Sequence, residues 1–281
     1  MTLITSLANP HVAQVRDLHT TKGRKKSGLL LMEGPHLLDA LLLADMLPRE
    51  IYYQPEFLQR TPEGRALLAR LLHSSTSLPG VSLFEVTTRV SEALSDTQTS
   101  QGVHAVLPLH LFNPEHLLTR RPLSARPVLL VLDDLADPGN MGTILRTALA
   151  ADVQEVLLTP HCVDCYSPKV VRAAAGAHVA LPVWTNLLWS EIEERIARHC
   201  GAAALRVFIA ESSGSQLYYA EDLRRPFALI IGNEAHGLSP QAHALATRTL
   251  SIPLANQVES LNAAMATGIL LFEAVRQLRC A

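Results

Sequence analysis

Three loops of this 281-residue chain combine polar side chains with the glycine or proline residues that tight turns require. The first covers Asp133–Gly142 and is followed by Arg146, the second covers Ile231–Leu238, and the third covers Ile252–Asn262. Each loop follows an apolar stretch typical of a buried β-strand. Ligands of an open parallel sheet bind outside the carboxyl ends of its strands. The three loops are therefore the candidate site.

The side chains in these loops could orient a ligand and stabilise charge that develops on it. Five of them carry amide, guanidinium, carboxylate or hydroxyl groups: Asn140, Arg146, Glu234, Ser260 and Asn262. Gly232 and Gly237 flank Glu234, which suits a loop whose backbone a ligand approaches closely. Each loop also has an ordinary interpretation, because Asn140 or Ser260 could simply cap a helix and Arg146 could be a solvated surface side chain.

Several familiar kinds of ligand site are absent from the sequence. No two glycines are separated by a single residue, so there is no G-x-G-x-x-G dinucleotide motif, and no Gly-Lys pair exists for a P-loop. Cys162 and Cys165 have Cys-x-x-Cys spacing beside His161, which is compatible with zinc or thiol redox chemistry. No second ligand pair stands at a recognisable spacing, and two ordinary thiols in a loop are the favoured interpretation.

Strands and helices are predicted to alternate after residue 128, which indicates a parallel, doubly wound α/β sheet. The predicted strands are 128–132, 155–159, 179–184, 205–210, 227–231 and 249–252. The predicted helices are 140–151, 167–175, 190–199, 239–246 and 260–276, with a short helical piece near Tyr218. Ser167 and Ser239 each precede a proline and are expected to cap a helix, and Ser260 is expected to cap the last one.

The chain is expected to divide into two domains. Residues 1–107 are predicted to form a smaller α/β domain, with strands at 50–53 and 103–107. Residues 108–127 are rich in Pro, Arg and Leu and are interpreted as a linker. Residues 128–281 form the parallel-sheet domain. At 48% hydrophobic and 18% charged residues, the chain can bury one large core or two unequal ones.

Charge is uneven along the chain. The formal net charge is −2, which does not indicate a nucleic-acid-binding protein, so any such site must be a local patch. Within residues 1–30 a single acid, Asp17, stands against five bases: Arg16, Lys22, Arg24, Lys25 and Lys26. This net +4 segment is a candidate nucleic-acid-binding patch, and a solvated basic turn is the alternative.

Nothing in the sequence predicts secretion or a membrane span. The first twenty residues lack a continuous apolar segment, and the most apolar stretch, 29–47, is interrupted by acidic residues and a histidine. Four cysteines in a chain of this length are too few for a disulfide framework, which is consistent with a reducing compartment. A cytoplasmic location is therefore expected.

Taken together, the three loops resemble the three signature motifs of the SpoU (TrmH) family of RNA ribose methyltransferases, in the SPOUT superfamily. The matching residues are Asp137-Pro138-Gly139-Asn140-x-Gly142 with Arg146, then Ile231-Gly232-Asn233-Glu234-x-x-Gly237-Leu238, then Ile252-Pro253 with Glu259-Ser260-Leu261-Asn262. Residues 1–107 are similar to the substrate-binding domain of many members, through Asn9-Pro10, Arg24-Lys25-Lys26, Glu33-Gly34 and Gln101-Gly102-Val103. Ala263-Ala264 and the Cys-x-x-Cys loop depart from the family pattern without removing a polar group that the chemistry requires.

The resemblance implies S-adenosylmethionine-dependent methylation of a ribose 2′-hydroxyl in structured RNA, with rRNA favoured over tRNA. It implies a trefoil knot formed by the second and third loops, and an obligate homodimer in which the first loop completes the partner's site. It places the cofactor against Gly232, Ile252 and Leu261, with Asn140, Arg146, Glu234, Ser260 and Asn262 around the ribose. Methyl transfer needs no metal.

A guanidinium stays protonated in proteins, so Arg146 is interpreted as a fixed cation that positions RNA and stabilises the developing oxyanion. The proton acceptor is left open among phosphate, water and a carboxylate such as Glu234. Two alternatives are a catalytically silent RNA-binding member of the fold and an enzyme that methylates a base nitrogen. The pairing of Asn140 with Arg146 favours ribose methylation.

Overall fold

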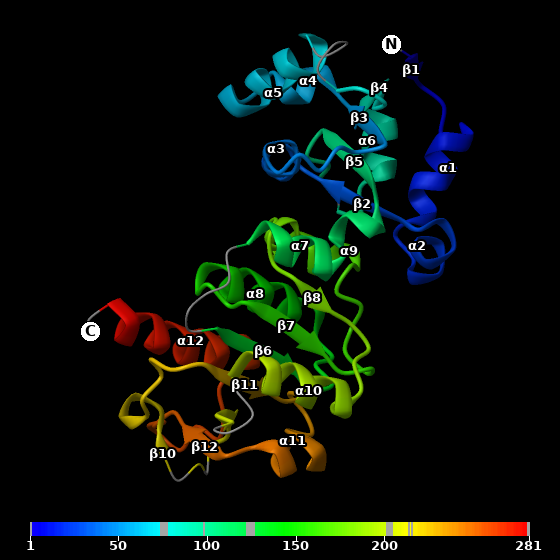
Figure 1. Ribbon diagram of the computed structural model, residues 1–281. Helices are drawn as coiled ribbons and strands as arrows, with labels where there is room; N and C mark the ends of the chain where they lie inside the picture. The colour runs from blue at the N-terminus through cyan, green and yellow to red at the C-terminus, as the bar shows by residue number, and fades with distance from the viewer. Residues whose placement is uncertain are drawn as a thin grey trace. The chain divides into compact units, whose positions relative to one another are not determined.

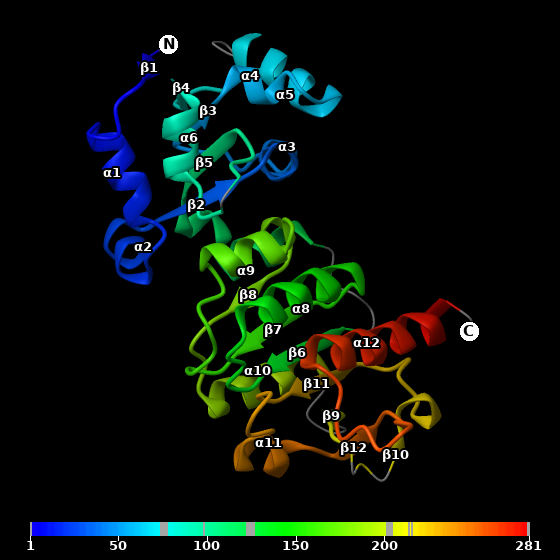
Figure 2. The same cartoon turned by 180° about the vertical axis from the view of Figure 1, so that it is seen from behind.

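The computed structural model describes residues 2–73, 78–97, 99–121, 127–200, 205–212, 214 and 216–279. The predicted linker lies partly outside them, at 122–126. The chain divides into two compact units, Met1–Phe112 with Tyr166–Val179, and Asn113–Cys165 with Ala180–Ala281. Figures 1 and 2 show their elements from opposite sides.

The first unit is built on a mixed five-stranded sheet in the order β1-β4-β3-β5-β2. Its strands are β1 (Thr2–Ile4), β2 (Leu29–Glu33), β3 (Glu50–Tyr53), β4 (Ser82–Val86) and β5 (Val103–Pro108). Both predicted strands are confirmed. The helices between the strands are α1 (Pro10–Asp17), α2 (Thr21–Ser27), α3 (Pro35–Leu43), α4 (Pro55–Leu58), α5 (Pro62–His73) and α6 (Thr88–Leu94), and the 3₁₀ helix η1 (Leu109–Phe112) follows β5.

Strand β3 shows how this sheet separates two apolar cores. Successive side chains of a strand point to opposite faces. Ile51 and Tyr53 lie in the core that α3 and α5 cover, whereas Tyr52 lies in the core that α1 and α6 cover. All three side chains are fully buried. The sheet is therefore covered on both faces, and the edge strand β2 is one of its two borders.

A helix from much later in the sequence completes the first unit. Helix α9 (Pro168–Ala173) and the 3₁₀ turn η2 (Ala177–Val179) place Val171 and Val179 in the same core as Leu30 and Leu38. Helix α9 packs against β2. Residues 166–179 are thus flanked along the chain by the second unit but fold with the first.

The second unit contains a seven-stranded sheet in which every pairing is parallel, in the order β10-β12-β9-β11-β6-β7-β8. Its strands are β6 (Val128–Leu132), β7 (Glu155–Leu158), β8 (Val183–Trp184), β9 (Val207–Ala210), β10 (Gln216–Leu217), β11 (Phe227–Ile231) and β12 (Arg248–Ser251). This confirms the predicted parallel α/β sheet. Strand β8 is shorter than the predicted 179–184, because residues 177–179 form η2 instead.

Helices lie on both faces of this sheet (Figures 1 and 2). Ile192, Ile196 and Ala242 pack α10 (Trp189–Cys200) and α11 (Pro240–Leu245) onto side chains such as Val131 and Ile230. Helices α8 (Pro138–Ala150) and α12 (Ala263–Arg279) pack against each other. Among the described residues, the unit also contains α7 (Pro114–Arg120) and the 3₁₀ helix η4 (Tyr218–Ala220).

Three predicted caps differ from the observed ones. Asp137, rather than Asn140, caps α8, and its carboxylate accepts from the Asn140 backbone N–H at 2.7 Å. The last helix begins at Ala263, so Ser260 lies outside it, and Asn262 Oδ1 accepts from the N–H groups of residues 264 and 265. Ser167 forms no side-chain cap, whereas the predicted cap at Ser239 is confirmed. Neither Asn140 nor Ser260 therefore serves as a helix cap through its side chain.

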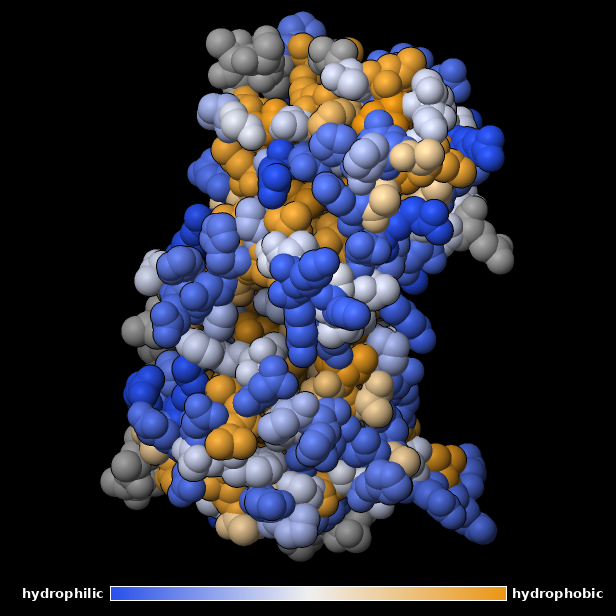
Figure 3. Space-filling view, turned by 90° about the vertical axis from the view of Figure 1, so that its right-hand side faces the viewer, coloured by the Kyte–Doolittle hydropathy of each residue, from blue (hydrophilic) through white to orange (hydrophobic). Residues whose placement is uncertain are grey.

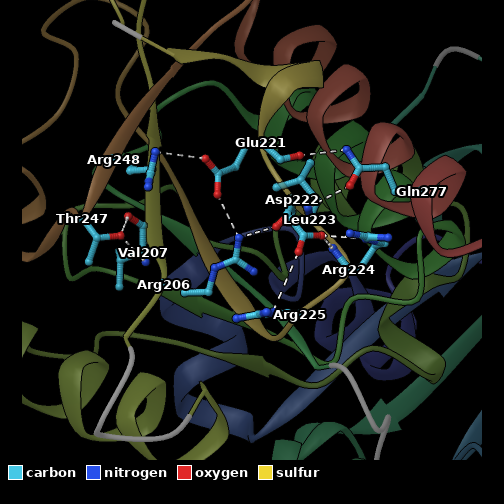
Figure 4. A network of polar contacts seen from close by, with 10 residues as sticks. All are labelled: Arg206, Val207, Glu221, Asp222, Leu223, Arg224, Arg225, Thr247, Arg248 and Gln277. Carbon is cyan, nitrogen blue, oxygen red and sulfur yellow. Dashed lines mark hydrogen bonds and ion pairs between the residues drawn. The ribbon is translucent and has the colours of Figure 1, made fainter. Parts of the chain in front are cut away.

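A network of charged side chains fixes the amino ends of several strands of the second unit (Figure 4). Glu221 binds Arg206, just before β9, at 2.9 Å and Arg248, at the start of β12, at 3.5 Å. Gln277 of α12 donates to the Glu221 carbonyl and accepts from the Leu223 N–H, both at 2.9 Å. The network therefore ties α12 to the end of the sheet opposite to the three candidate loops.

Among the described residues, no helix is long and apolar enough to cross a membrane.

Candidate active site

Asn140 joins the three polar loops through its side chain. Its Nδ2 donates to Glu234 Oε1 at 2.7 Å, and its Oδ1 accepts from Asn262 Nδ2, also at 2.7 Å. These residues are 94 and 122 positions away from Asn140 along the chain. One residue from each loop thus takes part in a single chain of hydrogen bonds at the carboxyl end of the sheet.

Two partly buried hydrogen bonds hold the first and second loops together. Asp133 is 1% exposed, and its Oδ2 accepts from the Ser239 backbone N–H at 2.7 Å. Asn233 Nδ2 donates to the Asp134 carbonyl at 2.7 Å. Asp134 has a left-handed backbone, with φ of 55°, and Thr159 stabilises it, because its hydroxyl accepts from the Asp134 N–H and donates to its carboxylate. The bonds to the carboxylates of Asp133 and Asp134 are charge-assisted and therefore stronger than neutral ones, so the loops are held in a fixed arrangement.

Gly232 is required by the second loop itself. A Cβ atom there would lie 2.6 Å from the Gly237 carbonyl and 2.8 Å from the Leu238 nitrogen. The loop returns on itself at this point, because the backbones of Asn233 and Gly237 exchange two hydrogen bonds of 2.9 Å. The sequence pattern predicts a closely approaching ligand as the reason for this glycine, whereas the close neighbour in the structure is the chain's own backbone.

Two adjoining cavities lie beside this cluster. The larger, of about 470 Å³, is lined from the second and third loops by Gly232, Glu234, Ser260, Leu261 and Asn262, among others. The smaller, of about 100 Å³, is lined by Ile252, Leu250 and Leu254. Both share Leu261, Ser260 and the segment 210–212. All three predicted cofactor contacts, Gly232, Ile252 and Leu261, therefore line one or both cavities.

The charges around the cavities are of one sign. Among the described lining residues the ionisable side chains are two carboxylates, Glu211 and Glu234, without a lysine, arginine or histidine. Aliphatic side chains such as Leu238, Leu261 and Ile252 provide apolar walls. A ligand with an apolar aromatic part and a net positive charge fits this lining, and S-adenosylmethionine, which carries an adenine and a sulfonium, has both.

Arg146 is the predicted catalytic residue that the structure does not bring to the cluster. It lies on the exposed side of α8 and lines neither cavity. Within the part of the chain that the structure describes, no hydrogen bond or ion pair engages its guanidinium. The side chain is therefore available to a partner outside its own subunit.

Four of the five predicted RNA-binding side chains are exposed, and one is buried. Arg16, Lys22, Lys25 and Lys26 are exposed on α1 and α2. Arg24 is only 3% exposed, and its guanidinium donates to the Leu18 carbonyl at 2.7 Å and to the Thr21 hydroxyl at 3.1 Å. Arg24 thus holds the turn between the two helices, and its side chain is not available to RNA.

Sequence reasoning gave no role to Glu211, Asp133 or Asn233. Glu211 lines both cavities, and His243 lies 3.4 Å from its carboxylate. It directly follows a predicted strand, so the rule that ligands bind at carboxyl ends could have found it. The roles of Asp133 and Asn233 depend on contacts across more than ninety residues, which spacing along the sequence does not reveal.

Cys162 and Cys165, which follow β7, form no disulfide among the described residues. Cys162 donates to the Leu132 carbonyl at 3.2 Å, and burial raises the pKa of its thiol. A raised pKa disfavours the reactive thiolate. Among the described residues, no group of three or more His, Cys, Asp or Glu side chains is arranged to hold a metal ion.

Comparison with known proteins gives a consistent result over the whole chain. The family model of the SpoU rRNA Methylase family matches residues 127–272, and that of the MRM3-like substrate binding domain matches residues 9–105. A Synechocystis protein named as an uncharacterized tRNA/rRNA methyltransferase is 37% identical over 275 residues, which are 98% of this chain and 93% of that protein.

The 23S rRNA (guanosine(2553)-2'-O)-methyltransferase RlmP of Bacillus subtilis is 31% identical over 272 residues, covering 97% of this chain and 98% of the relative. The crystal structure of an AdoMet-bound rRNA methyltransferase from Sinorhizobium meliloti superimposes with a TM-score of 0.79 at 30% identity, covering 99% of this chain and 98% of that one.

Proposed function

Since the chain belongs to the SpoU rRNA methylase family, we propose that it transfers a methyl group from S-adenosylmethionine to a ribose 2′-hydroxyl of ribosomal RNA. The observation that carries this proposal is the chain of hydrogen bonds from Glu234 through Asn140 to Asn262, at the edge of a cavity lined by carboxylates. The RlmP relative and the AdoMet-bound structure support the acceptor and the cofactor.

When bound, S-adenosylmethionine supplies an electrophilic methyl group on a sulfonium. Gly232, Leu261 and Ile252 would hold it in the two cavities, and the carboxylate of Glu211 would favour its positive charge. Ser260, at the junction of the cavities, is placed to orient it. Fixing the reacting groups in line supplies much of the rate of such a transfer.

The acceptor hydroxyl must lose a proton during the reaction. Glu234 Oε1 is held by Asn140, and its other oxygen has no partner among the described residues. We propose that this oxygen of Glu234 accepts the proton of the 2′-hydroxyl, because Asn262 and Asn140 fix the direction of the carboxylate. Arg146 supplies a fixed positive charge that stabilises the oxyanion that develops, as an electrostatic and positioning group.

We further propose that the enzyme is a homodimer and that Arg146 acts in the partner's site. Arg146 lies away from the cavities of its own subunit. Met265 and Phe272 of the neighbouring helix α12 are 59% and 48% exposed, which is unusual for large apolar side chains on one helix. A two-fold contact would cover the same surface on both subunits. The family resemblance further supports a trefoil knot of the loops around 231–238 and 252–262.

A complementation experiment tests the shared site. Arg146→Ala and Gly232→Val variants, each inactive alone, are mixed under conditions that exchange subunits. If Arg146 acts in the partner's site, heterodimers contain one complete site and recover part of the activity. A mixture that forms heterodimers but stays inactive contradicts the shared site.

We assign residues 1–107 to RNA binding and residues 128–281, apart from 166–179 that fold with the first unit, to methyl transfer, with the two parts joined through 108–127. The match of residues 9–105 to a substrate binding domain supports the first assignment. We place the protein in the cytoplasm, where bacterial ribosomal RNA is found, on the strength of the Bacillus subtilis relative.

The activity is tested by incubating the protein with unmodified 23S rRNA transcript and S-adenosylmethionine, followed by nuclease digestion and mass spectrometry of the nucleosides. A 2′-O-methylated nucleoside is expected. A base-methylated nucleoside would instead show a base-nitrogen methyltransferase, and RNA binding without any methylated product would show a silent member of the fold.

A further inference from the structure

Two short helices from distant parts of the sequence flank the same edge strand of the first unit. Helices α2 and α9 both pack against β2, although about 140 residues separate them along the chain. His19, just before α2, lines a small cleft together with Pro168 and Arg172 of α9. Figures 1 and 2 show both helices beside β2. A residue next to α2 and residues of α9 therefore meet at this cleft.

The outer side of α2 consists of lysines. Lys22, Lys25 and Lys26 are exposed, and no described residue forms an ion pair or hydrogen bond with their ammonium groups. Their spacing of three and four residues places them on one side of the helix. The buried guanidinium of Arg24 anchors the opposite side. Figure 3 shows the side of the molecule on which α2 lies in Figure 1, and hydrophilic side chains predominate there.

Helix α9 likewise has one buried side and one exposed basic side. Val170 and Val171 are buried, at 0% and 4% exposure, whereas Lys169 and Arg172 are exposed three residues apart. The Lys169 ammonium has no partner among the described residues. One nitrogen of Arg172 binds Asp96, which fixes the guanidinium and leaves its other N–H donors available.

We propose that α2 and α9 form one continuous phosphate-binding surface for the RNA, so that a helix within the methylase-matched region takes part in RNA capture. Exposed lysines without acidic partners are the groups that replace counterions along an RNA backbone. An arginine fixed by a carboxylate adds a planar donor for a phosphate. The inference rests on the proposed function, because RNA is taken to be the ligand.

The stretch of chain that leads into α9 also contains a residue that supports the candidate active site. Thr159, which fixes the strained backbone of Asp134 in the first loop, precedes α9 by nine residues. The same short stretch of chain thus carries a group that shapes the candidate active site and the cations that we assign to RNA. Phosphate contacts fix the register of a nucleic acid on a protein without reading its sequence.

The test compares Lys169→Ala and Lys169→Glu with Arg198→Ala, which removes an exposed arginine paired with Glu194 on α10. Affinity for unmodified 23S rRNA transcript is measured at several salt concentrations. Each lost phosphate contact lowers the slope of log affinity against log salt by about 0.7 to 0.9, which is roughly a fivefold loss of affinity at 0.15 M salt. We expect that effect for Lys169→Ala, a larger one for Lys169→Glu, and none for Arg198→Ala.

Calorimetric binding of S-adenosylmethionine and the melting temperature should be unchanged in all three variants, which shows that the fold is intact. Wild-type affinity and salt slope for Lys169→Glu would overturn the inference while leaving RNA methylation in place. An equal loss in Arg198→Ala would overturn it as well, because the effect would then reflect overall charge. Absence of RNA binding by the wild-type protein would overturn the proposed function itself.

Discussion

Replacing Gly232 by alanine should open the second loop and weaken cofactor binding. The added Cβ would lie 2.6 Å from backbone atoms of Gly237, so one side of the loop must move. The movement breaks the two backbone hydrogen bonds between Asn233 and Gly237. Each such bond contributes about 0.5 to 1.5 kcal/mol. If the loop must close again to bind ligand, the cost of roughly 1 to 3 kcal/mol weakens binding roughly 5- to 150-fold.

The assay is calorimetric titration with S-adenosylmethionine, together with thermal melting. Gly268→Ala is the matched control, because its Cβ would lie at an ordinary 3.7 Å from the Thr147 methyl group within a helix. Alanine there should leave binding unchanged and stabilise the helix by about 1 kcal/mol. Wild-type affinity and melting temperature for Gly232→Ala would refute the steric reasoning. A loss of binding in Gly268→Ala would show that the loop is not the cause.

Three further changes test separate parts of the account. Burial lowers the pKa of His104 to about 4, so the folded state resists its protonation while the unfolded state takes up the proton. Between pH 7.5 and 5.5 this histidine alone should lower the stability of the wild type in urea denaturation by about 1 kcal/mol, and His104→Gln should lack that part of the loss. Glu211→Gln should weaken binding of S-adenosylmethionine roughly fivefold, because one charge interaction of about 1 kcal/mol is removed. It should weaken binding of the product S-adenosylhomocysteine less, because the product lacks the sulfonium charge, and equal losses would contradict an electrostatic role. Phe272→Glu should give monomers in analytical sedimentation. Leu43→Glu, at a 79% exposed position of the first unit, should leave the dimer intact. A dimer that persists in both variants would exclude α12 from the interface.

The sequence predicted the parallel sheet and the candidate loops because both depend on local patterns. Apolar strands followed by polar, glycine-containing turns are readable along the chain, and Glu234 and Asn262 lie where such turns place them. Cap assignments at Asn140 and Ser260 were wrong, since Asp137 and Asn262 satisfy the helix N–H groups instead. A cap depends on which of several neighbouring polar residues the backbone directs inward, and composition does not decide that.

Features that depend on long-range packing could not be read from the sequence. The burial of Arg24 follows from the turn at Leu18, so a basic run that looked uniform contains one inward residue. Nothing local in Lys169 or its neighbours indicates that α9 folds with the first unit. The need for Gly232 was anticipated, but its cause was not, because the approach of Gly237 is a property of the folded loop.

Ribose methylation is decided by the chemical position of the transferred methyl group. Unmodified 23S rRNA transcript is incubated with the protein and methyl-labelled S-adenosylmethionine and then hydrolysed in alkali, which cannot cleave the bond after a 2′-O-methylated ribose. We predict that the label is recovered in an alkali-stable dinucleotide with the wild-type protein and is lost with Asn140→Ala, which breaks the hydrogen bonds between the three loops. Label recovered in mononucleotides, or undiminished transfer by Asn140→Ala, would contradict the account.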